Sequence, residues 1–224
     1  MKSLSHLINK FQRIPAAKSS FFISFEGIEG CGKSTQIKMF EAHLKKQGYE
    51  VHLYREPGGT QFGENLRQAI LDSQEELHSL AEAHLFASSR AQLLANKILP
   101  LLKKEKTVVL LDRYIDSSLC YQGVGRNLGI DTILEIHQHG PLCLLPHATF
   151  YLEISLKTSF DRQSIRGNKK DYFESQNEEF YHKLLQGYQD IAQLFPSRIH
   201  RINAEGSTNE VQGQILEKWK EIKK

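Results

Sequence analysis

The chain has 224 residues, of which 40% are hydrophobic and 25% charged, and its formal net charge is +3. These values are typical of one globular domain with a sizeable core. So modest a charge gives no reason to expect a nucleic-acid partner. No apolar run approaches the roughly 20 residues that span a bilayer, so no membrane segment is expected.

The three cysteines, Cys31, Cys120 and Cys143, are widely spaced and odd in number. This usage disfavours disulfides and is typical of the reducing cytosol, so we expect a cytoplasmic protein. No two of the cysteines lie at the C-x₂₋₄-C spacing that is typical of zinc ligands. The sequence therefore predicts no zinc site.

The first twenty residues carry four basic side chains and no acidic one, with apolar residues at helical spacing. A targeting or membrane-touching segment would show this pattern. A disordered extension, or a start codon assigned too early, explains it as well, and we favour that interpretation. Residues 1–20 are therefore expected to be a disordered, dispensable extension, and residues 21–224 a single domain.

From residue 21 onward, short apolar segments alternate with amphipathic ones. Strands are predicted where β-branched and other apolar residues run together, and helices where they recur at helical spacing. The predicted strands are 21–25, 50–55, 107–111, 149–154 and 198–203. The predicted helices are 34–47, 63–71, about 80–104, 178–194 and 209–223. This alternation indicates a three-layer α/β fold, with a central five-stranded parallel sheet flanked by helices.

A glycine-rich segment follows the first strand and reads Gly27, Ile28, Glu29, Gly30, Cys31, Gly32, Lys33, Ser34, then Thr35. It fits the pattern G-x-x-x-x-G-K-[ST], in which backbone N–H groups and a helix N-terminus surround phosphate oxygens. Lys33 would add a charge for the outer phosphates, and the Ser34 hydroxyl would bind Mg²⁺. Its place between a strand and a helix predicts a P-loop NTPase-type fold that binds ATP.

Several arginines lie after strands or in one polar segment, and they narrow the class. They are Arg55, Arg90, Arg113, Arg126, Arg162 and Arg166. Phosphoryl transfer between two phosphates brings several negative charges together, and arginine neutralises them with a planar fork of donors. The pattern favours a nucleotide kinase.

Four ordered blocks resemble the thymidylate kinase family. They are the phosphate loop with its flanks (25–35), Arg-Glu-Pro-Gly-Gly-Thr (55–60), Phe-Ala-Ser-Ser-Arg-Ala-Gln (86–92) and Asp-Arg-Tyr-Ile-Asp-Ser-Ser-Leu-Cys-Tyr-Gln-Gly (112–123). The resemblance runs from about residue 21 to the C-terminus. It implies transfer of the ATP γ-phosphoryl group to dTMP, giving dTDP, in a homodimer formed through the long helices.

The resemblance also implies a role for each matching residue. The expected dTMP-binding residues are Glu29, Arg55, Phe86, Arg90, Arg113, Ser118, Tyr121 and Gln122. Among them, Arg55 and Arg113 would hold the acceptor phosphate, and Phe86 would stack on thymine, with Arg90 one helical turn later at the base edge.

Further roles concern the sugar and the metal. Glu29 would face the sugar hydroxyl, Ser118 would bond the base, and Tyr121 would pack under the sugar. Asp112 would join Ser34 in placing Mg²⁺. Structural alternatives stay open, because Phe86 and Tyr121 could be core aromatics, Glu29 an exposed carboxylate and Asp112 a helix cap.

The polar segment 162–174 resembles the mobile lid of the family. The expected catalytic residues are Lys33, Asp112 and Arg113, together with an arginine from the lid. Arg166 is the first choice for this catalytic arginine and Arg162 the second. One family arginine of the lid is replaced by Tyr172. Two alternatives remain: a kinase for another nucleoside monophosphate or a deoxynucleoside, and a nucleotide-binding relative without turnover.

Overall fold

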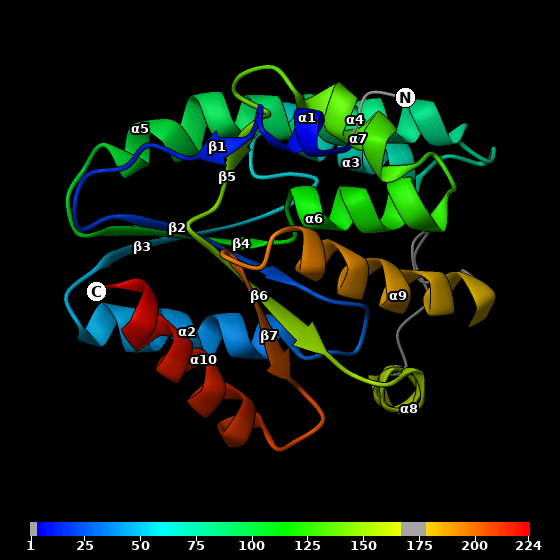
Figure 1. The fold of residues 1–224 in the computed structure, drawn as a ribbon. Helices are drawn as coiled ribbons and strands as arrows, with labels where there is room; N and C mark the ends of the chain where they lie inside the picture. The colour runs from blue at the N-terminus through cyan, green and yellow to red at the C-terminus, as the bar shows by residue number, and fades with distance from the viewer. Residues whose placement is uncertain (1–3, 167–177) are drawn as a thin grey trace.

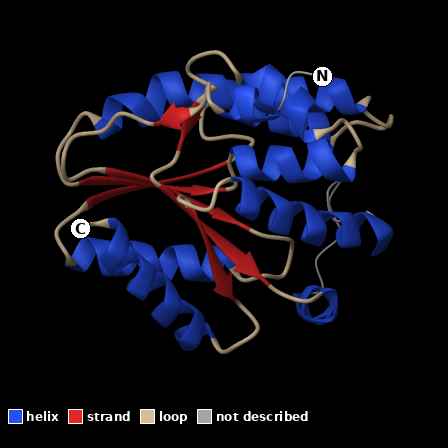
Figure 2. Ribbon diagram, viewed as in Figure 1, coloured by secondary structure: helices blue, strands red, loops and turns tan. Residues whose placement is uncertain are grey.

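Five short strands lie parallel in one sheet, between two layers of helices, in a computed structural model that describes residues 4–166 and 178–224 (Figures 1 and 2). The strands are β2 (Phe21–Glu26), β3 (Glu50–Arg55), β4 (Thr107–Asp112), β6 (Ala148–Glu153) and β7 (Ile199–Asn203). Their order across the sheet is β3-β4-β2-β6-β7. The predicted α/β fold with a five-stranded parallel sheet is confirmed.

The strand sequences explain why the sheet is covered on both faces. Val108, Val109, Leu110 and Leu111 of β4 have no exposed surface, and β2 and β6 are buried in the same way. A central strand whose side chains all point into apolar layers needs such a continuous hydrophobic run. β3 lies at the edge of the sheet, and its residues are either exposed or half-buried.

Helices α2 (Lys33–Lys46) and α10 (Thr208–Ile222) cover one face of the sheet, as Figure 1 shows. The helices of the other layer are α3 (Gln61–Leu71), α4 (Ser79–Leu93), α5 (Leu99–Leu102), α6 (Ile115–Ser118), α7 (Ile130–His137) and α9 (Glu178–Leu194). α8 (Leu156–Arg166) stands beside the ends of the strands. None of the described helices is long and apolar enough to span a membrane.

Three helical regions differ from the prediction, and one of them is α8, which lies in a segment for which no helix was predicted. The single helix expected at about 80–104 is α4, a π-helix η1 (Leu94–Ile98) and α5. Pro100 has no N–H for the helical ladder, so regular hydrogen bonding cannot run through it. The segment after β4, for which no helix was predicted, forms α6, a π-helix η2 (Leu119–Gly125) and α7.

The disorder predicted for residues 1–20 is wrong for residues 4–20. They form α1 (Leu4–Ile8) and β1 (Gln12–Arg13), and β1 pairs in parallel with β5 (Leu144–Leu145). Leu7 and Ile14 are each only 2% exposed and belong to the main core. The partner strand lies more than a hundred residues away, so the local sequence did not reveal this packing.

Deleting residues 1–17 should therefore destabilise the protein. The truncation exposes the core surface under Leu7 and Ile14, whose burial contributes about 3–6 kcal/mol in total. Urea denaturation should show a loss of that order, whereas His6→Ala, at an exposed position, should have little effect. Equal stability of the truncated and full-length proteins would show that the segment does not pack as described.

Candidate active site

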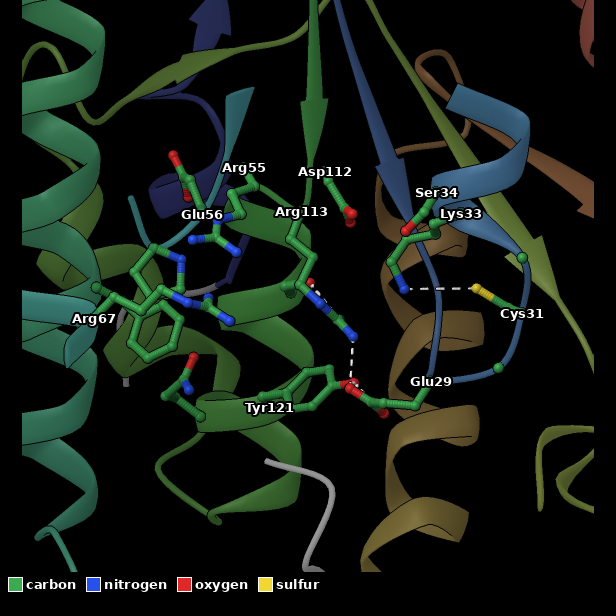
Figure 3. Close-up of a pocket in the computed structure, with 16 residues that line it drawn as sticks. Glu29, Cys31, Lys33, Ser34, Arg55, Glu56, Arg67, Asp112, Arg113 and Tyr121 are labelled. Atoms are coloured by element: carbon green, nitrogen blue, oxygen red, sulfur yellow. Dashed lines mark hydrogen bonds and ion pairs between the residues drawn. The ribbon is translucent and has the colours of Figure 1, made fainter. Parts of the chain in front are cut away.

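A pocket of about 290 Å³ opens at the carboxyl ends of β2, β3 and β4 (Figure 3). In parallel α/β sheets this edge is where ligands bind, because loops and helix N-termini converge there. The pocket is lined by Glu29, Gly30, Cys31, Gly32, Lys33, Ser34, Arg55, Glu56, Pro57, Arg67, Phe86, Asp112, Arg113, Ser117, Tyr121 and Gln122. The described structure thus brings the glycine-rich loop and most of the predicted acceptor residues into one cavity.

The glycine-rich loop needs its glycines for steric reasons. Gly27 has φ 139°, and a Cβ there would lie 2.6 Å from the Leu152 carbonyl oxygen. Gly30 has φ 78°, and its Cβ would lie 2.7 Å from the Ser159 carbonyl oxygen. Any side chain would push the loop away from β6 and α8. The resulting curl leads into the N-terminus of α2, where backbone N–H groups gather.

Lys33 lies inside this curl. Its Nζ donates to the Gly27 carbonyl oxygen at 2.8 Å, and the Cys31 Sγ lies 3.6 Å away. The ammonium is held by weak neutral acceptors of the loop, so a phosphate oxygen would be a stronger partner for it. This placement supports the ATP-binding role predicted for the loop.

Glu29, Arg113 and Tyr121 form a compact cluster across the pocket. Arg113 Nη2 donates to Glu29 Oε1 at 2.6 Å, and the Tyr121 hydroxyl donates to the same oxygen at 2.9 Å. The Arg113 guanidinium also lies 4.9 Å from the centre of the Tyr121 ring. These contacts show that Glu29 is not simply an exposed loop carboxylate, and they link the glycine-rich loop to the acceptor side of the pocket.

The backbone of Arg113 adopts the left-handed region, with φ 69°. Its N–H donates to the Phe25 carbonyl oxygen at 3.0 Å, and the next N–H, of Tyr114, donates to Glu26 Oε1 at 2.7 Å. Ser117 Oγ donates to the other Glu26 oxygen at 2.6 Å. The end of β2 therefore holds the strained turn that presents Arg113.

Glu26 was not among the predicted site residues. It has no exposed surface, and burial, followed by the nearby Asp116, raises its pKa to about 8. An acidic residue at the last position of an otherwise apolar strand was the available signal. Glu26 anchors the Arg113 turn by accepting from the Tyr114 N–H, 88 residues later in the chain. Local sequence patterns do not reveal a contact over that separation.

Arg55 and Arg67 bring two more guanidinium groups to the pocket (Figure 3). Arg55 Nη2 donates to Glu64 Oε2 at 3.1 Å, and this carboxylate in turn accepts the Gly59 N–H, so α3 steadies the turn after β3. Arg67 was not predicted, because an arginine on an amphipathic helix resembles any solvated surface charge. Three arginines therefore line the same cavity, from β3, from α3 and, with Arg113, from the turn after β4.

Phe86 and Gln122 form the wall expected to face the base, since both line the pocket. Phe86 is 8% exposed, and Tyr121 is 7% exposed. Gln122 Nε2 donates to Glu82 Oε1 at 2.7 Å, which fixes the amide in the wall. Phe86 and Tyr121 are thus largely buried, and both also line the pocket.

Arg90 and Ser118 lie behind this wall and are not among the pocket-lining residues. Arg90 is 1% exposed; its Nε and Nη2 contact Glu56 Oε2 at 2.7 and 2.5 Å. Nη2 donates to Ser118 Oγ at 3.0 Å, and Nη1 contacts His137 Nε2 at 2.6 Å. The guanidinium lies 5.1 Å from the Tyr114 ring centre. Arg90 is thus fixed by four residues from three segments of the chain.

Ser34 and Asp112 face the cavity near Lys33 (Figure 3). Among the described residues, no group of three or more His, Cys, Asp or Glu side chains could hold a metal ion by itself. Mg²⁺ generally keeps several waters and binds through one or two protein oxygens with substrate phosphates. A hydroxyl and a carboxylate beside the phosphate loop fit that requirement.

Helix α8 contacts the glycine-rich loop directly. Ser159 Oγ donates to the Glu29 carbonyl oxygen at 2.7 Å, and Arg162 Nη1 donates to the Gly30 carbonyl oxygen at 3.4 Å. Arg162 Nη2 also donates to the Ala204 carbonyl oxygen at 3.1 Å. The side chain of Arg166 and residues 167–174 of the predicted lid, with Tyr172, lie outside the described residues.

His137 gives the folded state a pH dependence that can be measured. Burial, with Arg90 next, lowers its pKa to about 3, below the usual 6.5. Between these two pKa values the unfolded chain binds more protons at this position than the folded chain does. The neutral, buried His137 therefore adds to the free energy of unfolding fully above pH 6.5, and this contribution is lost as pH falls toward 3. From pH 7 to pH 5 the loss is about 2 kcal/mol.

Replacing His137 with Gln should remove this contribution. Urea denaturation at pH 7 and pH 5 measures the free energy of unfolding. On acidification this free energy should fall by about 2 kcal/mol less in the variant than in the wild type. The comparison between the two proteins cancels other titrating groups, such as His147, whose pKa burial lowers to about 4. The same acid sensitivity in both proteins would contradict a buried neutral His137.

The fold and the site together define a P-loop phosphotransferase, in which a triphosphate-binding loop shares one cavity with an arginine-rich acceptor site. The family model for thymidylate kinase matches residues 25–215. The thymidylate kinase of Caldanaerobacter subterraneus subsp. tengcongensis is 44% identical over 177 residues, covering 79% of this chain and 84% of that protein.

Two further relatives agree. The thymidylate kinase of Thermoanaerobacter sp. (strain X514) is 41% identical over 196 residues, or 88% of this chain and 95% of that protein. The crystal structure of thymidylate kinase from Ehrlichia chaffeensis superposes with a TM-score of 0.73 at 30% identity, covering 90% of this chain and 99% of that one. The chain belongs to the thymidylate kinase family.

Proposed function

We propose that this protein transfers the γ-phosphoryl group of ATP to dTMP, forming dTDP and ADP. The observation that carries the proposal is one cavity lined by the phosphate loop, by Arg55, Arg67 and Arg113, and by Phe86. No covalent intermediate is required, because positioning and charge neutralisation account for most of the catalysis in phosphoryl transfer.

On the donor side, the loop from Gly27 to Thr35 surrounds the β- and γ-phosphates with N–H groups. Lys33 leaves the Gly27 carbonyl oxygen, which it contacts at 2.8 Å, and binds a phosphate oxygen instead. The exchange replaces a neutral acceptor with a charged one, so it is favourable only when the triphosphate is present.

On the acceptor side, Arg55 and Arg113 hold the phosphate of dTMP, and Arg67 adds charge to the same cavity. Phe86 stacks on thymine and Gln122 lies beside it. Glu29 is held by Arg113 and Tyr121, so it accepts from the sugar hydroxyl without leaving the loop. Tyr121 packs beneath the sugar and disfavours a ribose hydroxyl.

The edge of the base faces the buried Arg90 and Ser118. The bonds that Arg90 makes to described residues use four of its five N–H groups and leave one on Nη1. Ser118 Oγ accepts from Arg90, so its own hydrogen is free to be donated. Two donors at this edge match the carbonyl oxygen of thymine and disfavour an amino group in its place.

Mg²⁺ bound with ATP would be held through the Ser34 hydroxyl and the Asp112 carboxylate, directly or through water. When bound, the ion would neutralise negative charge on the phosphates. Arg113 adds positive charge next to Asp112, where the two phosphates meet.

We also propose that the segment 162–174, which begins within α8, closes over ATP, with Arg166 as its catalytic arginine and Arg162 as the second choice. Its support is the contact of α8 with the phosphate loop through Ser159. Closure would exclude water, so that the phosphoryl group goes to dTMP.

A cytoplasmic homodimer is the last part of the proposal. Phe62 of α3 and Leu80 of α4 are 47% and 39% exposed, which suits a contact between long helices of two copies. The three cysteines are unpaired, as expected in a reducing compartment. Light scattering of the purified protein would measure the mass of the assembly.

The function is tested by a coupled assay of ADP release with ATP and Mg²⁺. The acceptors are dTMP, dUMP, UMP, CMP, AMP, GMP and thymidine. Fast release with dTMP and slower release with dUMP is the expected result. Preference for another acceptor would overturn the assigned base wall. ATP binding without release for any acceptor would identify a relative without turnover.

A further inference from the structure

His137 is a buried side chain that neither the phosphate loop nor the acceptor blocks include. It is the last residue of α7 and has no exposed surface. Its two ring nitrogens make different contacts: Nδ1 lies 2.8 Å from the Ile133 carbonyl oxygen, and Nε2 lies 2.6 Å from Arg90 Nη1.

The partners fix the tautomer of the ring. A carbonyl oxygen only accepts, so His137 Nδ1 carries the hydrogen and donates it to Ile133. A guanidinium only donates, so Nε2 is unprotonated and accepts from Arg90. Burial and Arg90 hold the pKa of His137 far below neutral, which keeps the ring in this form. The histidine is therefore a neutral acceptor with a fixed direction.

We infer that His137 is a positioning residue for recognition of the acceptor base, acting through Arg90. Glu56 holds Nε and Nη2 of the guanidinium, and Ser118 accepts a second hydrogen from Nη2. His137 takes one of the two Nη1 hydrogens. A guanidinium is planar, so the bond from one Nη1 hydrogen to His137 also fixes the direction of the second Nη1 hydrogen.

This arrangement has a consequence for selectivity. The direction of Arg90 also fixes Ser118 Oγ, which accepts from it at 3.0 Å. Without an acceptor at position 137, a buried charged donor loses its partner, and the guanidinium must tilt to find another. The alignment of both donors with the base edge is then lost, while the phosphate loop, built from other residues, is unaffected.

The test compares His137→Leu with His137→Gln. Leucine removes the acceptor, whereas the glutamine amide oxygen can reach the place of Nε2. The inference rests on the proposed function, so the wild type must first show turnover with dTMP; absence of turnover there would reject that function itself. Steady-state kinetics then give kcat and KM for dTMP, dUMP, dCMP and ATP in each protein.

We expect KM for dTMP to rise about tenfold or more in the leucine variant, with KM for ATP within about twofold of the wild type. Preference for dTMP over dCMP should fall with it. The glutamine variant should recover most of the affinity for dTMP. Equal losses in both variants, or parallel changes in both KM values, would show a merely structural role and overturn the inference.

The leucine variant also leaves Arg90 partly unpaired, so its fold must be checked. Double-mutant analysis with Arg90→Lys keeps the test decisive if His137→Leu alone is unstable. In the Arg90→Lys background the change from His137 to Gln or Leu should alter KM for dTMP much less than in the wild type. Independent, additive effects on KM would contradict coupling through Arg90.

Discussion

Replacing Lys33 with Met should lower kcat for dTDP formation about a thousandfold. Methionine keeps the length and the apolar stem of the side chain, so the buried part of the loop stays packed. What is lost is the only side-chain ammonium that lies inside the loop in the described residues, where Nζ contacts the Gly27 carbonyl oxygen. Removing one such charge-stabilising donor in other enzymes costs a factor of about 10²–10³.

The control is Lys46→Met, in the last turn of the same helix and exposed to solvent. It changes the net charge by the same amount but lies outside the pocket, so kcat should stay within about twofold of the wild type. Rapid-quench or coupled assays under saturating ATP and dTMP measure the two variants. A Lys33→Met enzyme with more than about a tenth of the wild-type kcat would remove Lys33 from the catalytic residues.

The site was predictable where its chemistry is local in the sequence. The segment from Gly27 to Ser34 carries its backbone geometry and its ligands within eight residues, so the pattern alone located the phosphate loop. Arg55 and Asp112 were found because they follow strands of a parallel sheet, whose carboxyl ends meet at one edge. The order of four blocks placed Phe86 and Tyr121 in the same pocket.

The groups that orient these residues could not be predicted in the same way. Glu26 contacts Tyr188 across 162 residues, and Arg90 contacts His137 across 47. Such contacts arise from the packing of whole elements, which no local sequence pattern shows. Arg67 was missed for the related reason that helical spacing does not show which face a pocket adjoins.

The fold shows the same division between local and distant information. The strands were predicted to within about one residue because continuous apolar runs mark buried parallel strands. The pairing of β1 with β5 was missed, since two-residue strands carry no pattern of their own and exist only through their partner. The helix α6 after Asp112 was missed because its buried residues include polar ones, so apolar residues do not recur there at helical spacing.

Arg113→Lys should raise KM for dTMP about a hundredfold and lower kcat as well. Arg113 contacts Glu29 at 2.6 Å and Ser117 Oγ at 3.1 Å, and its guanidinium also lies over the Tyr121 ring. A lysine keeps the charge but has a single ammonium, so it cannot make these contacts and hold a phosphate at the same time. Two charge-assisted bonds to the acceptor phosphate are worth roughly that factor.

Arg201→Lys is the matched control, because Arg201 is an exposed arginine of β7 that pairs with Glu153 outside the pocket. Its kinetic constants should match those of the wild type. KM for ATP should rise less than KM for dTMP in Arg113→Lys, since the ATP phosphates have the loop and Lys33 as other partners. A uniform rise for both substrates would assign Arg113 to the donor side, and unchanged KM values would leave Arg55 and Arg67 as the acceptor clamp.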